Sequence, residues 1–231
     1  GLVAVGLAEA NLMIDEDNSA YLGNGTVLDA LGDVTVRAQI DHTGDLEVNT
    51  NGGGLIDVAD SGAAMTDAYR NRAAIQDGAR VSALGAVSVT ADTALDGEVY
   101  ADADASGGGA GANADVRFEI EEDSLTETAI GSNALVSGAT VDLNALVSTL
   151  IASATAEAQA NAALAFADAV AETLIDETSR VQLGAGAWVE GSTVNLLARH
   201  QSVAVSSSAD GDANGLGDAA RTSTTDYERS S

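Results

Sequence analysis

The feature that most limits what this sequence can fold into is a block of residues that recurs along the chain. The block from Leu22 to Ala38 aligns without a gap on the block Ile75–Ala91, and it returns at Ile130–Ala145 and Leu183–Ala198. Small or aliphatic residues fill the same places in each copy, which indicates a true internal repeat of about 53 residues. A repeat of this length constrains the fold more strongly than any single motif does.

A glycine column lies between the blocks. It contains Gly1, Gly54, Gly109 and Gly215, with Ala162 as the exception. These junctions predict one domain, a single solenoid segment over residues 1–231. They divide it into repeats 1–53, 54–108, 109–161 and 162–214, followed by a partial repeat 215–231.

Each block reads as strands and turns. Apolar and polar residues alternate from Val34 to Ile40 and again from Val87 to Ala91. A period of two places the apolar residues on one face of a strand. Glycine runs at 52–54 and 107–109 indicate turns, because glycine adopts positive φ angles without steric cost. The sequence therefore predicts an all-β unit.

One segment favours a different structure. Residues Ala152 to Leu174 are rich in Ala and Glu, which by intrinsic propensity favour a helix. The equivalent segments of the other repeats contain glycine runs or alternate as strands do. Equivalent positions of a repeat protein adopt the same structure, so we expect strand, turn and strand here, with a helical insertion as the alternative.

A β unit of this size cannot bury its apolar face alone, and stacking like units solves that problem. Val34, Val87, Val141 and Val194 would then form one inward column. This predicts a β-solenoid, similar to a parallel β-helix, in which strands pair with the winding above. A β-sandwich built from repeat pairs is the alternative fold. The long alternating segments favour one wide winding per repeat over several narrow ones.

Charge excludes several functions. The net charge is -27, all basic residues are Arg, and the chain has no cysteine or proline. Cysteine-free sequence excludes disulfides and thiolate metal sites. Such an acidic chain is repelled by nucleic acid and by anionic membranes, and no apolar run reaches the roughly 18 residues of a membrane span. Intrinsic disorder, the other reading of high net charge, is disfavoured by the regular aliphatic spacing.

The repeated blocks beginning at Ala20 and Ile75, with their Gly-Asp-Val-Thr-Val-Arg-Ala and Gly-Ala-Val-Ser-Val-Thr-Ala endings, resemble repeats of large bacterial filamentous-haemagglutinin-like adhesins. The resemblance extends over all four repeats. It implies a segment of a long, secreted, surface-attached rod. It implies no catalytic residues.

An acidic segment near the C-terminus is the candidate metal site. Asp210, Asp212 and Asn214 place oxygen ligands at alternate positions before Gly215, as in the opening of a calcium loop. The twelfth position lacks the bidentate Glu of an EF-hand, so that fold is excluded. Asp104 falls in the same repeat column as Asp210, five residues before the glycine. We expect either calcium binding or a solvated charged corner.

The remaining candidates favour structural roles. His42 and His200 lack further ligands at metal-binding spacing, so we expect both on the surface. Trp188 and Phe118 are expected to pack in the core or at a corner. A nucleophile motif of the Gly-x-Ser-x-Gly type is absent from the sequence.

These features favour a non-enzymatic structural or adhesive segment of an extracellular or cell-surface filament. Its expected partners are neighbouring repeats, like subunits or a surface glycan, with no nucleic acid and no membrane span. A calcium-dependent glycan-binding module, or a glycoside hydrolase on a parallel β-helix, is the alternative. The apolar N-terminus lacks the basic leader of a signal peptide, so we expect the chain to begin inside a longer protein.

Overall fold

The computed structural model describes residues 2–230, and this part of the chain is built from strands and turns without a helix. It therefore contains no helix long and apolar enough to span a membrane. The strands, in chain order, are β1 (Val3–Leu22), β2 (Val27–Ala30), β3 (Val34–Asn51), β4 (Gly54–Ile75), β5 (Arg80–Ala83), β6 (Ala86–Ile130), β7 (Leu135–Ser137), β8 (Thr140–Leu183), β9 (Trp188–Glu190), β10 (Thr193–His200), β11 (Val203–Asn214) and β12 (Asp218–Ser230).

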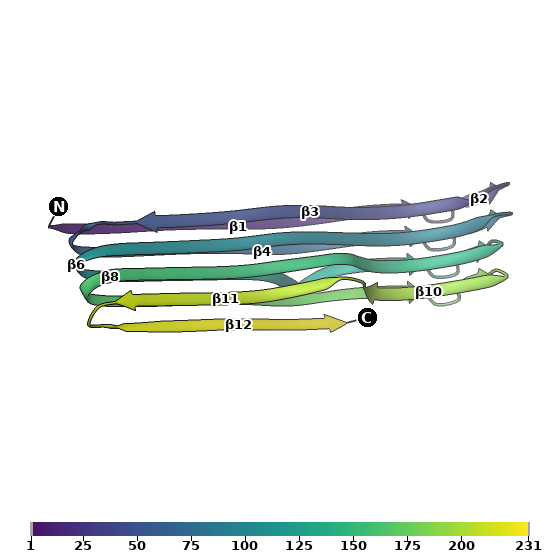
Figure 1. The fold of residues 1–231 in the computed structure, drawn as a ribbon. Coiled ribbons are helices and arrows are strands. Elements are labelled where there is room, and N and C mark those ends of the chain that lie inside the picture. Colours follow the sequence, from purple (N-terminus) through teal and green to yellow (C-terminus); the bar gives the residue numbers. More distant parts are fainter. Residues whose placement is uncertain (1, 231) are drawn as a thin grey trace.

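The chain runs back and forth in flat windings that stack on one another (Figure 1). We call the sheet of β1, β4, β12 and the later halves of β6 and β8 the first face. The second face holds β3, β10, β11 and the earlier halves of β6 and β8. The short strands β2, β5, β7 and β9 form a separate sheet that closes one end. Strands β6 and β8 are long because each continues around the opposite end, from the second face to the first.

Every strand pair is parallel and joins equivalent places of successive blocks. Val34 pairs with Val87, Val87 with Val141, and Val141 with Val194. The expected valine column is therefore confirmed in its register. Val34, Val87 and Val141 are buried, whereas Val194, in β10, is 36% exposed. Each block makes one wide winding. Parallel pairing contradicts the sandwich alternative, whose sheets are antiparallel. The arrangement is all-β and is consistent with a parallel β-helix or solenoid.

The Ala-rich segment Ala152–Leu174 lies wholly within β8, so the expectation of strand structure is confirmed. Ala154 pairs with Val99 and Ala171 with Val116, both of which are strand residues of the preceding winding. Pairing with these neighbours satisfies the backbone of the segment, and its inward alanines are almost completely buried. Tertiary context thus overrides helix propensity here.

The expectation that Gly109 belongs to the glycine column is wrong. The register pairs Gly54 with Gly107, and Gly107 with Ala162, whereas Gly109 lies opposite Ile56. Two extra residues of this winding sit in a bulge between Ile120 and Ser124, away from the turn, so an alignment anchored on glycines misplaced them. Gly1, also assigned to this column, lies outside the described residues.

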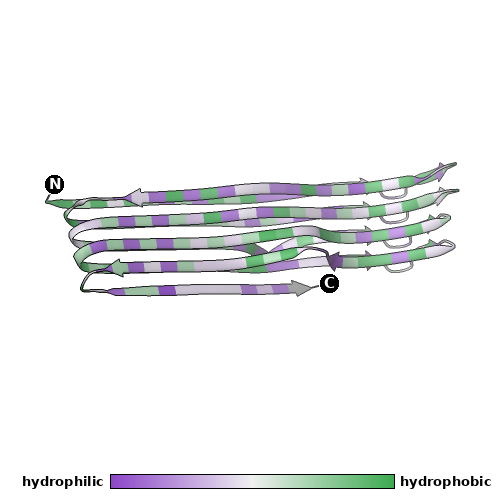
Figure 2. Ribbon diagram, in the orientation of Figure 1, coloured by the Kyte–Doolittle hydropathy of each residue, from purple (hydrophilic) through white to green (hydrophobic). Residues whose placement is uncertain are grey.

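Two apolar cores fill the interior, and hydropathy alternates along the long strands (Figure 2). The larger core lies between the two faces and includes Phe118, which is 2% exposed. The smaller core lies at the end closed by the short strands and includes Val87 and Val136. Phe118 therefore packs in the core as expected. Trp188 does not, because it is 61% exposed and its indole nitrogen donates to Glu190.

The turns before the short strands repeat one conformation. Gly25, Gly78 and Gly186 have φ angles of 65°, 66° and 72°, and Asn133 takes the fourth place at 55°. Glycine and asparagine tolerate this left-handed region best. Side chains link the turns along the stack, since the backbone nitrogen of Asp77 donates to Asn24 Oδ1 at 3.1 Å. The turns therefore reinforce the same register as the strands.

Candidate functional site

A band of polar side chains crosses the interior between the two apolar cores. On the first face it comprises two inward columns, one of Glu16, Tyr69, Ser124 and Glu177 and the other of Asn18, Asn71, Thr126 and Ser179. On the second face Thr93, His42 and His200 point into the same band. We call this set the buried polar band. Buried polar groups are costly unless they find partners, so the band must be internally paired.

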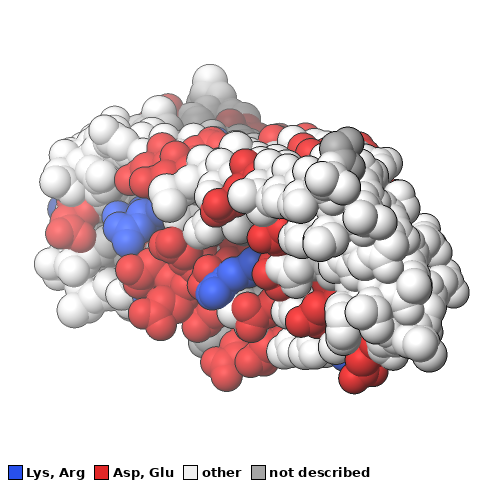
Figure 3. Space-filling model, turned by 90° about the vertical axis from the view of Figure 1, so that its left-hand side faces the viewer, with Lys and Arg blue, Asp and Glu red and all other residues white. Residues whose placement is uncertain are grey.

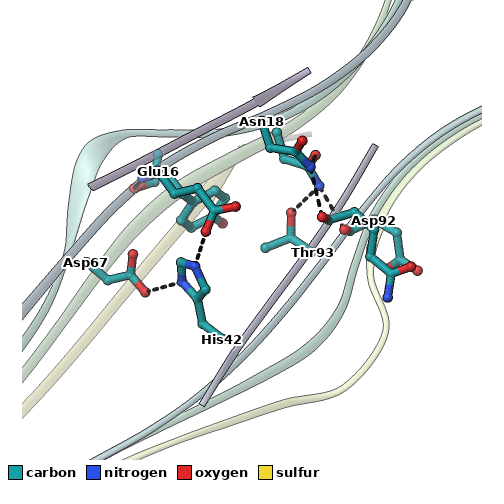
Figure 4. A network of polar contacts seen from close by, with 10 residues as sticks. Glu16, Asn18, His42, Asp67, Asp92 and Thr93 are labelled. Atoms are coloured by element: carbon teal, nitrogen blue, oxygen red, sulfur yellow. Dashed lines mark hydrogen bonds and ion pairs between the residues drawn. The ribbon is translucent and has the colours of Figure 1, made fainter. Parts of the chain in front are cut away.

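At one end of the band His42 lies between two carboxylates (Figure 4). Its Nε2 contacts Glu16 Oε2, and its Nδ1 lies 3.4 Å from Asp67 Oδ2. Burial lowers the pKa of His42, but the hydrogen bond to Glu16 and the charge of Asp67 outweigh that effect and raise its pKa above 6.5. Burial raises the pKa of Asp67, although His42 opposes the change. The geometry thus favours a charged imidazole between the two acids.

Amides and hydroxyls form the middle of the band. Asn71 donates to the carbonyl of Asp92 at 2.7 Å and to Thr93 Oγ1 at 3.0 Å. The hydroxyls of Thr93 and Thr126 lie 2.8 Å apart. Asn18 repeats the pattern one winding earlier by donating to the carbonyl of Gln39 at 2.8 Å. These bonds join the two faces across the interior.

At the far end His200 lies against a fully enclosed carboxylate. His200 Nε2 is 2.7 Å from Glu177 Oε1, and the two side chains are 1% and 0% exposed. The hydroxyl of Tyr69 donates to the other oxygen of Glu177, and the ring of Tyr227 meets His200 edge-on at 6.3 Å. Burial and the charge of Glu177 raise the pKa of the Tyr69 hydroxyl well above 10.

Both histidines are inside the molecule, so the expectation that they lie on the surface is wrong. Each histidine occupies an inward column whose neighbouring member is apolar: His42 pairs with Leu95, and His200 with Val147. The residue types in these columns therefore do not indicate a buried histidine. The enclosure of His200 and Glu177, at 1% and 0% exposure, keeps a substrate from reaching them, whereas His42 is 17% exposed. Within residues 2–230 no group of three or more His, Asp or Glu side chains is arranged to hold a metal ion.

The proposed calcium ligands lie on a strand and not in a loop. Asp210, Asp212 and Asn214 alternate along the outer surface of β11, and alternate residues of a strand are about 6.7 Å apart. Asp210 is paired with Arg221 at 2.9 Å. Asp104 is not in the column of Asp210, because the register places Asp102 there. Calcium binding stays a prediction, which calorimetric titration of calcium into metal-free protein tests.

A second acidic surface surrounds the bulge in β6. Asp123 and Asp176 line a hollow of about 470 Å³. Glu121 and Glu122 lie in the bulge itself and line the same hollow. In the end-on view of Figure 3, carboxylates crowd one part of the surface around small basic areas, while a broad neighbouring part carries few charges. The acid excess is therefore unevenly distributed.

Two open grooves lie side by side on the outside of the first face. The apolar groove, of about 390 Å³, is lined mainly by small and apolar residues, among them Val58, Gly111 and Phe166, and also by Asp168 and Asp218. The acidic groove, of about 630 Å³, passes over Gly62 and carries four carboxylates, namely Glu9, Asp60, Asp115 and Glu172. Both grooves exist because glycine replaces a side chain in an outward column. The motifs and charges of the sequence do not predict these grooves, but an isolated glycine in an outward column is a signal that indicates one.

Comparison of the chain with protein-family models, with curated proteins and with solved structures gave no match.

Proposed function

We propose that this chain is a non-enzymatic structural and adhesive segment of a large secreted protein at the cell surface. In this proposal the four blocks and the partial fifth form a rigid acidic rod, as in the filamentous-haemagglutinin-like adhesins that the blocks resemble. The observation that carries the proposal is the parallel register that stacks β1 on β4, β4 on β6 and β6 on β8, and that resumes after each local bulge. A register of this kind extends by adding further blocks.

The contacts of the interior support a rigid rod. Hydrogen bonds and ion pairs of the buried polar band connect windings as well as faces, as in the contact between His42 and Asp67. A slip of one residue would move every apolar side chain to the outside and bring the outer carboxylates inside. The register is therefore strongly specified, as a rigid rod requires.

The exterior supports an extracellular setting. Ladders of carboxylates repel one another in dilute solution, and screening or bound cations relieve that repulsion in salt-rich surroundings. Asp102 and Glu157 occupy one such ladder, and burial together with the neighbouring charges of Asp104 and Glu157 raises the pKa of Asp102. Like charges at this density also keep neighbouring rods apart.

Electron microscopy of the full-length protein tests the proposal. Long rods of uniform width are expected, because stacked windings give a constant cross-section. Compact particles would overturn the structural role. Immunolabelling of intact cells adds the location, for which surface labelling without permeabilisation is expected.

A further inference from the structure

The outer surface of the first face combines exposed aliphatic residues with carboxylates in a regular order. At its turn end, two neighbouring columns present Val3, Ile56, Leu164, Val58 and Phe166, all of which are between 41% and 61% exposed. Soluble proteins rarely leave a contiguous apolar patch of this kind without a partner. We call these residues together with the apolar groove the apolar flank.

The acidic groove adjoins the apolar flank along the same strands. The outward residues of β6 begin with Gly109 and Gly111, which lie at the apolar flank. The outward residues that follow are Asn113, Asp115 and Arg117. Asn113 donates to Asp60 at 2.9 Å and to Asp115 at 3.2 Å, which holds these two carboxylates at the groove wall. The one cation in the groove, Arg117, is already shared between Glu119 and Glu172. The groove therefore offers uncompensated negative charge.

From this arrangement we infer that the apolar flank and the acidic groove together bind an extended, cationic and amphipathic polypeptide segment. The outward columns repeat every 6.7 Å or so, which is also the spacing of alternate side chains in an extended chain. A segment lying along β6 would place two apolar side chains on the flank and two Lys or Arg side chains, at the next alternate positions, over Asp60 and Asp115. The inference deepens the proposed adhesive function by naming a class of partner, and it rests on that function.

The net charge of the chain favours a basic peptide over a second copy of the chain as the occupant of this surface. Two copies would each bring a net charge of -27 to the contact, and opposing acidic surfaces disfavour association. A basic segment gains both the burial of apolar area and the attraction of the groove. Selectivity would come from the order of apolar and basic residues.

The experiment measures binding of synthetic peptides to the intact chain by fluorescence anisotropy. The probe is a labelled peptide in which Ser occupies every second position. The positions between the serines are Val, Phe, Arg and Arg, in that order. One comparison peptide has Glu in place of Arg, and another has the same composition in scrambled order. We expect the ordered basic peptide to bind about tenfold more tightly than the scrambled one, and 0.5 M salt to weaken its binding. Equal binding of both basic peptides, or no binding, would overturn the inference.

Two variants locate the site. A Cβ added at Gly111 meets no atom within 4 Å, so Gly111→Gln fills the apolar groove without disturbing the fold. It should weaken binding about tenfold, and Phe166→Ser should act in the same direction. Ser208→Gln, at an exposed position of β11 on the other face, is the matched control and should bind normally.

Three results of these measurements contradict the inference. One is normal binding by both Gly111→Gln and Phe166→Ser, with unchanged melting curves. Another is equal loss in the Ser208→Gln control. The third is self-association in sedimentation that Gly111→Gln abolishes, because it would assign the surface to a second copy. None of these results bears on rod formation in electron micrographs, so failure of the inference and failure of the proposed function are distinguishable.

Discussion

The hydroxyl of Tyr69 donates to Glu177, although the two residues are 108 positions apart and belong to windings that are not adjacent. Ser124 takes the intervening place in their column, and its small side chain accepts a hydrogen bond from the Tyr69 backbone nitrogen at 3.4 Å. The bulge between Ile120 and Ser124 turns the larger acidic side chains of that winding outward. The two-residue insertion thus leaves the small side chain of Ser124 in the column, which gives Tyr69 room to reach Glu177.

Removal of the Tyr69 hydroxyl should destabilise the fold. Tyr69→Phe leaves one oxygen of a fully buried carboxylate without its donor, which costs about 1–3 kcal/mol. Tyr100→Phe is the matched control, because its hydroxyl donates to Glu157 at 3.0 Å in an exposed setting. That control should change stability by less than about 0.5 kcal/mol. Urea unfolding measures both variants, and equal losses would contradict the assigned role of the band.

The charged state of His42 predicts a pH dependence. Its pKa is raised in the folded chain, so its contribution is complete below 6.5, the ordinary value, and is lost as the pH rises through the folded pKa. The stability difference between the wild-type chain and His42→Gln should therefore shrink from pH 6 to pH 9. The carboxyl of Asp67 faces the same imidazole, and burial raises its pKa although His42 opposes the change. Urea unfolding at several pH values measures the difference, and a constant or growing difference would refute the charged imidazole.

Salt should stabilise the chain. A net charge of -27 makes the compact state self-repelling, and screening at higher ionic strength relieves that repulsion. We expect the melting temperature to rise steadily between 10 mM and 500 mM sodium chloride, by about 2–4 °C for each kcal/mol gained. Circular dichroism melting curves provide the measurement. A falling melting temperature would show that attractive ion pairs, such as Arg72 with Glu127, dominate.

The repeated turn conformation gives a clean backbone test. A Cβ at Gly78 meets no atom within 4 Å, so Gly78→Ala has only the left-handed φ angle of 66° to oppose it. The expected loss is about 1–2 kcal/mol. Gly111→Ala is the control, since it has equally open surroundings but a φ outside that region, and it should be neutral or stabilising. Equal effects in a denaturant titration would contradict the turn assignment.

The sequence predicted the fold better than the site. The aliphatic columns repeat so regularly that strand pairing, inward faces and the strand structure of Ala152–Leu174 followed from periodicity. Most polar inward residues do not repeat by type, although Asn18 and Asn71 do. Glu16, Tyr69 and Glu177 share a column that only the register reveals, because the bulge shifts the numbering within the winding that lies between Tyr69 and Glu177. The same shift explains why Asp104 was assigned to the wrong column.

Stacking of successive blocks in register is the central claim, and a distance between spin labels tests it most directly. The chain has no cysteine among its described residues, so Thr35→Cys with Asn195→Cys gives two specific labels at exposed places of one column. Three strand spacings separate them, so their Cα atoms should lie about 14 Å apart. Labels at Thr35→Cys and Ser208→Cys should lie about 40 Å apart, because they are displaced along the strands. A Thr35–Asn195 distance comparable to the second pair would contradict the stacked register.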